Sequence, residues 1–129
     1  MPFYLIQYSY TPEAWRALVT GTAERDRHKA VERLLNRHGG RFPRLTFDGD
    51  PPIVVMDKFV AFGESDVIAI VYFPDNQRAA AFAMSVLAGG AVRSFTTTPL
   101  LTLEEAIQSM EMAGSAFATY MPPQGLPKP

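Results

Sequence analysis

The segment Phe62-Gly63-Glu64-Ser65-Asp66-Val67-Ile68-Ala69-Ile70-Val71-Tyr72-Phe73 decides the fold of this chain. Its second half is rich in β-branched and aromatic residues, which is typical of a buried strand. Its first half is typical of a hairpin corner, because Gly63 can adopt a positive φ and Asp66 can accept hydrogen bonds from neighbouring backbone N–H groups. We therefore predict two strands joined at this corner, with Gly63 and Asp66 as its structural residues.

Alternating side chains predict a first strand over Phe3–Tyr10, with apolar groups on both of its faces. Thr11-Pro12-Glu13 predicts the start of a short helix, because it supplies a cap, a first-turn proline and an acidic residue. Gly21-Thr22 interrupts this helix, and the apolar spacing predicts a longer one from about Ala23 to Gly39-Gly40.

The second half of the chain predicts one more strand and two more helices. Pro74-Asp75-Asn76 caps a helix that ends at Gly89-Gly90, and alternation predicts a strand over Val92–Thr98. The capping box Thr102-Leu103-Glu104-Glu105 then begins a last helix. Between the first and second halves, Phe42–Phe47 and Ile53–Met56 can be extended while Asp48–Pro52 form a loop, so we expect a strand broken by an excursion.

The order strand, helix, strand, strand, helix, strand predicts an α+β, ferredoxin-like βαββαβ fold with an antiparallel sheet and an extra C-terminal helix. We expect one domain over residues 1–113 and a flexible tail over residues 114–129. Right-handed crossovers place both helices on one face of the sheet, so the other face is left bare. Since the strands are apolar on both sides, we expect a homodimer or higher oligomer that covers this face.

Composition limits the classes of function. The formal net charge of -1 speaks against a dedicated nucleic-acid binder, and no apolar stretch approaches the length of a membrane span. The absence of cysteine excludes disulfides and thiolate chemistry, and two histidines limit any imidazole metal site, so we expect neither a metal nor a cofactor. Because the start Met1-Pro2-Phe3-Tyr4 lacks a basic leader, we expect a cytoplasmic location.

Five motifs in order resemble the GYD domain family over about residues 3–113. They are Tyr4-Leu5-Ile6-Gln7-Tyr8-Ser9-Tyr10-Thr11-Pro12-Glu13, Gly39-Gly40, Phe62-Gly63-Glu64-Ser65-Asp66-Val67, Phe73-Pro74-Asp75-Asn76 and Thr97-Thr98-Pro99-Leu100-Leu101-Thr102. The resemblance implies a dimeric α+β barrel whose activity is not established. Ser65 stands where the family's signature tyrosine aligns, which puts a role for that phenol in doubt here. Residues 48–58 look like an insertion, either a surface excursion or part of a pocket mouth or oligomer contact.

Two residues are weak catalytic candidates. Asp66 can act as a general base if burial raises the pKa of its carboxyl, or it can simply hold the backbone of the corner. His38 can move a proton beside a cleft, or it can be a favourable cation at a helix C-terminus. His28 and Glu64 are expected to be solvated.

The ligand-binding candidates are Tyr8, Tyr10 and Arg93. Tyr4, Tyr8 and Tyr10 share a strand face and, with Arg93, can line an aromatic cavity, or they can pack at a subunit interface. Seven of the 12 Lys and Arg residues lie between Arg25 and Arg44, and the acidic residues Glu24, Asp26 and Glu32 stand beside or among them. This favours a solvated helix face with ion pairs over a site for an acidic ligand.

Three functions remain open from the sequence. The leading hypothesis is a small oligomeric binding or accessory protein that holds a small apolar or aromatic molecule in a barrel or inter-subunit cavity. A cofactor-free enzyme of the oxygenase or isomerase type, using Asp66 or His38, is the second. A structural oligomerisation module is the third.

Overall fold

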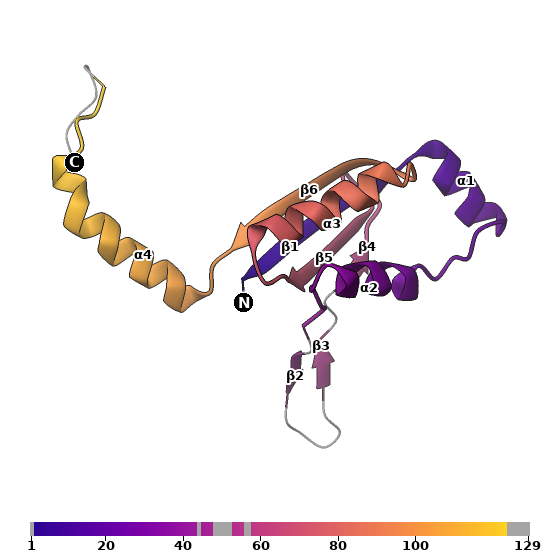
Figure 1. The fold of residues 1–129 in the computed structure, drawn as a ribbon, viewed down its shortest axis with the longest axis horizontal. Coiled ribbons are helices and arrows are strands. Elements are labelled where there is room, and N and C mark those ends of the chain that lie inside the picture. Colours follow the sequence, from indigo (N-terminus) through magenta and orange to yellow (C-terminus); the bar gives the residue numbers. More distant parts are fainter. Residues whose placement is uncertain (1, 44, 48–52, 56–57, 124–129) are drawn as a thin grey trace.

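The computed structural model describes residues 2–43, 45–47, 53–55 and 58–123 (Figure 1). The elements in chain order are β1 (Phe3–Tyr10), α1 (Pro12–Thr20), α2 (His28–Arg37), β2 (Leu45–Phe47), β3 (Ile53–Val55), β4 (Lys58–Val60), β5 (Val67–Tyr72), α3 (Asn76–Ala88), β6 (Val92–Leu100), α4 (Leu103–Ala116) and the 3-10 helix η1 (Phe117–Thr119). Every helix within the described residues is too short or too polar to cross a bilayer.

A four-stranded sheet with the order β4-β5-β1-β6 forms the centre of the molecule. All of its neighbouring strands are antiparallel, and β1 pairs with β5 on one side and with β6 on the other. This order confirms the ferredoxin-like α+β fold predicted from the sequence. In that fold the first strand of each strand-helix-strand half lies in the middle of the sheet, as β1 and β5 do here.

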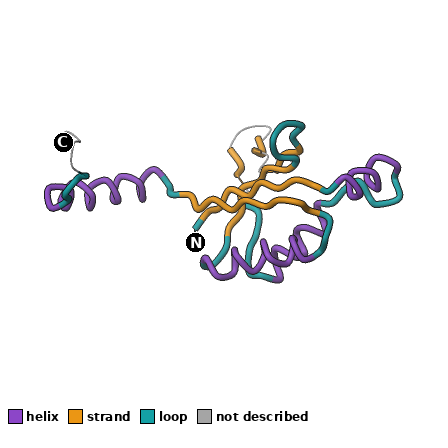
Figure 2. Tube along the Cα trace, turned by 90° about the horizontal axis from the view of Figure 1, so that it is seen from above, coloured by secondary structure: helices purple, strands orange, loops and turns teal. Residues whose placement is uncertain are grey.

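Helices α2 and α3 both lie against one side of the sheet (Figure 2). The side chains of Tyr4, Ile6 and Tyr8 on β1 point into this layer and are buried, as are Leu35 of α2 and Phe82 of α3. Helices α1 and α4 extend from opposite ends of the sheet and contribute no buried residue to this core.

The other side of the sheet, here called the open face, presents uncharged side chains at the paired positions of its four strands, and the Arg41 guanidinium lies over the Tyr72 ring at its rim. The pairing register places on it Phe3, Leu5, Gln7, Phe59, Ile68, Ile70, Tyr72, Thr96, Thr98 and Leu100. Phe59 keeps 57% of its surface exposed and Ile70 keeps 36%. The two-faced apolar pattern of β1 and β5 thus leaves apolar groups uncovered within this chain.

The segment between α2 and β5 is a strand broken by an excursion, as predicted: Arg41 pairs with Tyr72 of β5, and β4 resumes the pairing with β5 after the excursion. Strands β2 and β3 pair with each other in a separate two-stranded sheet, and only β4 joins the main sheet. The chain leaves the main sheet after Arg41, whose backbone exchanges hydrogen bonds of 3.0 and 2.8 Å with Tyr72. Of the predicted insertion 48–58, residues 48–52, 56 and 57 lie outside the described residues.

The second helix begins at His28, so the predicted start near Ala23 is wrong. The Arg25 guanidinium folds back onto the carbonyls of Leu18 and Val19, at 3.0 and 2.9 Å, and so satisfies the last turn of α1. The Asp26 carboxylate accepts the His28 N–H at 3.0 Å. These side-chain contacts stabilise a non-helical connection where apolar spacing alone favours a helix.

The predicted positive φ at Gly63 is also wrong. Among the described residues, positive φ occurs at Gly21, Gly39 and Gly90, which lie after helices. The corner is closed instead by the Ala61 N–H donating to the Asp66 carbonyl at 2.7 Å.

The last helix begins as predicted, because both hydrogen bonds of the capping box between Thr102 and Glu105 are present. It continues to Ala116, two residues beyond the predicted start of the tail at 114.

Gly40 should tolerate no side chain, whereas Gly63 should. A Cβ at Gly40 would lie 2.7 Å from both Phe73 Cε1 and the Tyr72 carbonyl oxygen, but one at Gly63 would meet nothing within 4 Å. We expect Gly40→Ala to lower the free energy of unfolding by about 1–3 kcal/mol, the usual range for overpacking. Gly63→Ala, the matched control, should change it by less than about 0.5 kcal/mol. Urea denaturation measures both, and equal effects would contradict this packing.

Candidate functional site

A hollow of about 240 Å³ lies between α2, α3 and the end of β1, and we call it the helix-pair hollow. Its walls come from two helices that are adjacent in space because both cover the same side of the sheet. The lining residues are Tyr8, Tyr10, Arg27, Ala30, Val31, Leu34, Phe82, Ser85, Val86, Gly89, Ala91 and Val92. The lining is therefore mostly apolar, with a few polar groups, as in small-molecule sites generally.

Tyr8 is held rigidly at this hollow. Its ring is 4% exposed and stacks on Phe95 with a centroid separation of 5.6 Å and an interplanar angle of 1°. The Tyr10 ring meets Tyr8 edge-on at 5.8 Å, and the Phe82 ring meets Phe95 at 6.0 Å. Because each ring is fixed by the next, the aromatic surface is formed before any ligand arrives.

The phenols of Tyr8 and Tyr10 are neighbours, since their rings meet edge-on at 5.8 Å. Burial raises the pKa of the Tyr8 phenol, and the neighbouring Tyr10 raises it further, while the Arg27 guanidinium acts in the opposite direction. Burial likewise raises the pKa of the Tyr10 phenol. Both phenols are therefore neutral near pH 7 and can donate or accept a hydrogen bond, with one cation close to them.

Two of the aromatic or basic candidates lie away from this hollow. Arg93 is exposed and lines a different, shallow depression together with Tyr10 and Asp66, so it joins Tyr10 there but does not join Tyr8. Tyr4 is buried, and its hydroxyl donates to the side-chain oxygen of Asn76 at the start of α3. Since Tyr4 and Tyr8 lie in the core beneath the helices, they do not pack at a subunit interface.

Asp66 holds the corner to the strand beside it. Its Oδ2 accepts the Tyr10 backbone N–H at 2.9 Å and the Trp15 indole N–H at 3.0 Å. These donors come from β1 and α1 and not from the turn itself, so the carboxylate joins the corner to two consecutive segments that precede it by more than 50 residues. Both hydrogen bonds go to one carboxylate oxygen, which gives Asp66 a sufficient structural role.

His38 lies at the end of α2, where its Nε2 is 3.0 Å from the Ser85 hydroxyl and its ring meets Phe82 edge-on. Ser85 lines the helix-pair hollow, but His38 does not. The contacts of His38 and Asp66 have no residue in common, so the structure does not bring the two catalytic candidates together.

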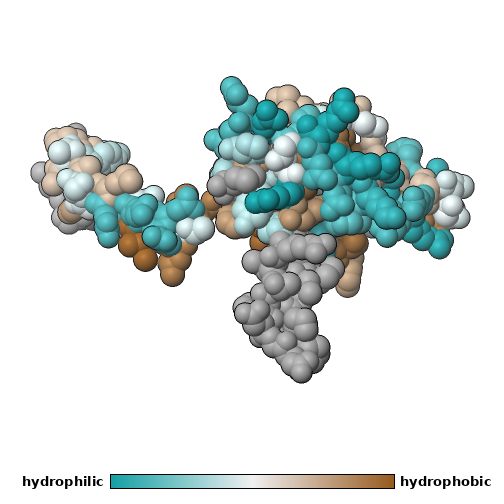
Figure 3. All heavy atoms as spheres, turned by 60° about the horizontal axis from the view of Figure 1, so that its bottom comes forward, coloured by the Kyte–Doolittle hydropathy of each residue, from teal (hydrophilic) through white to brown (hydrophobic). Residues whose placement is uncertain are grey.

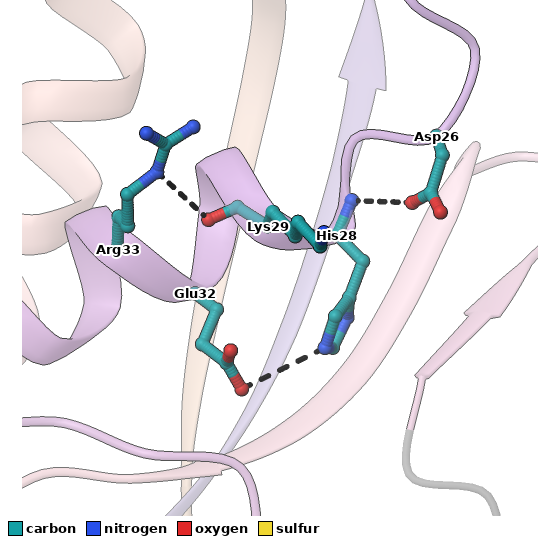
Figure 4. A network of polar contacts seen from close by, with 5 residues as sticks. All are labelled: Asp26, His28, Lys29, Glu32 and Arg33. Atoms are coloured by element: carbon teal, nitrogen blue, oxygen red, sulfur yellow. Dashed lines mark hydrogen bonds and ion pairs between the residues drawn. The ribbon is translucent and has the colours of Figure 1, made fainter.

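The basic stretch forms a solvated network at the start of α2 (Figure 4). His28 Nε2 lies 3.6 Å from Glu32 Oε2 one turn later, and both side chains are nearly half exposed. Arg33 Nε donates to the Lys29 carbonyl at 3.4 Å. Local contacts of this kind are typical of a hydrated helix face.

Arg27 is the site residue that the sequence did not single out. It lies just before α2 and lines the helix-pair hollow, although its position in a run of charges pointed only to a solvated face. No local pattern distinguishes it from its neighbours, because its proximity to Tyr8 follows from how α2 crosses the sheet.

A second hollow, of about 530 Å³, lies between α1 and β4 and shares Tyr10 and Arg27 with the first. Its walls include Val60, which is 70% exposed, and Phe59, which is 57% exposed. A small ligand there would stay in contact with water, so the helix-pair hollow is the better candidate site. Within the described residues, no group of three or more His, Asp or Glu side chains is placed to hold a metal ion.

The sheet order and the helix-covered core define a ferredoxin-like α+β domain. The GYD domain family matches this chain over residues 53–110, which confirms the resemblance over that stretch. The matched stretch contains the corner, Asp66, β5, α3 and β6, whereas Tyr8, Tyr10 and Arg27 precede it. Neither the curated proteins nor the solved structures gave a match to this chain.

Removing the Asp66 carboxylate should destabilise the fold. We expect Asp66→Ala to lower the free energy of unfolding by about 1–3 kcal/mol, because two donors lose their acceptor. Asp66→Asn should lower the free energy of unfolding by less, since the amide oxygen of Asn can still accept a hydrogen bond. Urea denaturation followed by Trp15, the single tryptophan, measures this. Glu64→Ala in the same corner is the control, and an equal loss there would contradict the role of Asp66.

Stability should fall at high pH because Tyr8 is buried in its neutral form. The folded pKa of Tyr8 lies above the unfolded value of 10.0, so above about pH 10 the unfolded chain loses its proton first. The free energy of unfolding should therefore decrease as the pH rises above about 10, and less steeply in Tyr8→Phe. Urea denaturation at several pH values gives the slope of the free energy of unfolding against pH. Identical slopes in the original protein and in Tyr8→Phe would refute the conclusion that buried, neutral Tyr8 causes the decrease.

Proposed function

We propose that this chain is a small binding protein that holds a single-ring apolar or aromatic molecule in the helix-pair hollow. The observation that carries the proposal is the 240 Å³ volume with Tyr8 and Tyr10 on its wall. An apolar cavity of about 150 Å³ is enough to bind benzene, so this volume suits one ring and a small substituent.

The chemistry of the lining supports a molecule with one polar end. Val31, Leu34 and Val86 provide apolar contacts, and Phe82 provides an aromatic one. Arg27 and the phenol of Tyr10 border both hollows, so a polar or anionic group can face the larger opening while the ring lies between the helices. The site we propose lies within one chain, in contrast to the barrel or inter-subunit cavity expected from the sequence.

The contacts of this chain do not favour the cofactor-free enzyme. Asp66 is engaged by two N–H donors, and His38 does not line the helix-pair hollow. A proton-transferring group must reach its substrate directly or through one water molecule. Ligand binding needs only the volume and the surface that the hollow provides.

Filling the hollow should abolish binding without changing the fold. Toluene and benzoate serve as probes, and we expect at least one of them to bind with a Kd below about 1 mM. Val86→Phe should weaken that binding at least tenfold, because a ring would occupy the space; amide chemical shifts in NMR titrations measure both the affinity and the location. Met84→Phe, on the exposed side of α3, is the matched control.

Two results would contradict the proposal. One is the absence of binding of either probe to the folded protein. The other is shift changes that cluster away from α2 and α3, or that persist unchanged in Val86→Phe. Oligomerisation without ligand binding would favour the structural module expected as the third function.

A further inference from the structure

Within the described part of the chain, the apolar side of helix α4 is left uncovered. Leu103, Ala106, Ile107, Met110 and Phe117 recur at the spacing that forms one stripe along a helix. Leu103 is 76% exposed and Met110 is 65% exposed, and no residue of α4 is buried. Figure 3 shows hydrophobic surface gathered along one side of this projecting helix and hydrophilic surface along the other.

A helix of 14 residues needs a partner for its apolar side. Isolated helices of this length are marginal in water, and amphipathic helices in proteins are stabilised by packing their apolar side. The only substantial contacts of α4 within the described part of the chain are with η1, which follows it directly. The capping box fixes where α4 begins, but it provides no surface on which the apolar stripe of α4 can pack.

The geometry of the connection keeps α4 off its own sheet. Strand β6 ends at Leu100 and α4 begins at Leu103, so only Leu101 and Thr102 separate them. Thr102 is extended and is held by both hydrogen bonds of the capping box. The chain would have to reverse direction within these two residues to lay α4 on its own open face, and instead α4 runs away from the sheet (Figure 1).

The open face is an unpartnered surface that suits α4. Its ten side chains are uncharged, and depletion of charge is the feature that distinguishes the core of a protein interface. A 14-residue helix is about 21 Å long and the 8-residue strand β1 is about 26 Å long, so one helix can lie across most of the face.

The charges point to a protein partner for α4. Helix α4 carries Glu104, Glu105 and Glu111, and residues 94–123 contain no Lys or Arg. Helices that bind membrane surfaces are rich in Lys and Arg on the polar side, so a lipid surface is a poor match. At the rim of the open face, by contrast, the Arg41 guanidinium lies 5.2 Å from the Tyr72 ring centroid, where it can face these carboxylates.

We propose that α4 is an exchanged arm that packs across the open face of a second copy of this chain, which returns the same contact. A two-fold symmetric pair uses the same surfaces twice, so each copy contributes both an arm and an open face. A stable interface involves about 20–30 residues a side. The open face alone supplies half of that or less, and the arm supplies most of the rest. The inference does not depend on ligand binding.

Cysteine cross-linking tests the proposal directly, because the chain has no cysteine of its own. We would mix full-length Ile107→Cys, on the arm, with full-length Ile70→Cys, on the open face, and oxidise the mixture. We expect a disulfide-linked pair of chains on a non-reducing gel, at least fivefold more than for Gln108→Cys mixed with Ile70→Cys. Gln108 is the matched control because it lies on the polar side of α4.

Several outcomes would overturn the exchange. If Ile107→Cys alone cross-links as well as the mixture, α4 pairs with α4; if Ile70→Cys alone does so, the open faces meet directly. If the double variant Ile70→Cys/Ile107→Cys closes a disulfide within one chain, the arm folds onto its own sheet. Absence of any cross-link also overturns it.

A second variant tests whether the arm holds the pair together. Leu103→Glu/Ile107→Glu changes side chains that are 76% and 45% exposed and lie outside the buried core, so the domain should still fold. We expect a shift from dimer to monomer at micromolar concentration in size-exclusion chromatography with light scattering. Gln108→Glu should remain a dimer, and a Leu103→Glu/Ile107→Glu dimer would contradict the role of α4. Toluene and benzoate titrations of the same variants test ligand binding separately.

Discussion

The structure depends on one constraint, namely that β1 and β5 lie side by side in the middle of the sheet while both carry apolar groups on both faces. Their pairing joins residues 3–8 to residues 67–72, so it can form only when the two halves of the chain come together. Burial of apolar surface is the main favourable term in folding, and each side of a central strand requires its own cover. Helices α2 and α3 provide that cover for one side only.

The covered side explains the candidate site. Large rings from β1, β6 and α3 contact one another in sequence, from Tyr10 through Tyr8 and Phe95 to Phe82. Rings of this size fill a core in fixed geometry, and a hollow remains beside them between α2 and α3. The matched family stretch supplies α3 and β6, while the tyrosines and Arg27 come from the part before it. The walls of the hollow therefore come partly from the stretch that matches the GYD family and partly from residues that precede that stretch.

The corner at Phe62–Val67 organises the chain and carries no chemistry of its own in the structure. Asp66 ties β5 to β1 and to α1, and the Asp66 N–H donates to the Tyr8 carbonyl at 2.9 Å. The corner thereby fixes the end of β1 from which the Tyr10 side chain reaches the hollow. The carboxylate of Asp66, a catalytic candidate in the sequence, thus holds the backbone of Tyr10 in place in the structure.

The sequence by itself determined the order of elements, the ferredoxin-like class, the caps at Thr11, Asp75 and Thr102, and the two-faced apolar strands, because periodicity and capping are local properties. It could not predict that β2 and β3 leave the main sheet, that α2 begins at His28, or that Gly63 has an ordinary φ. Those outcomes depend on contacts such as that of Arg25 with the end of α1, which join residues whose proximity no local pattern encodes. The tertiary structure also decided the site, since it placed Arg27 beside Tyr8 and separated Arg93, Asp66 and His38 from it. Side-chain type sets what a residue can do, but only the packing of α2 and α3 on the sheet sets which residues meet.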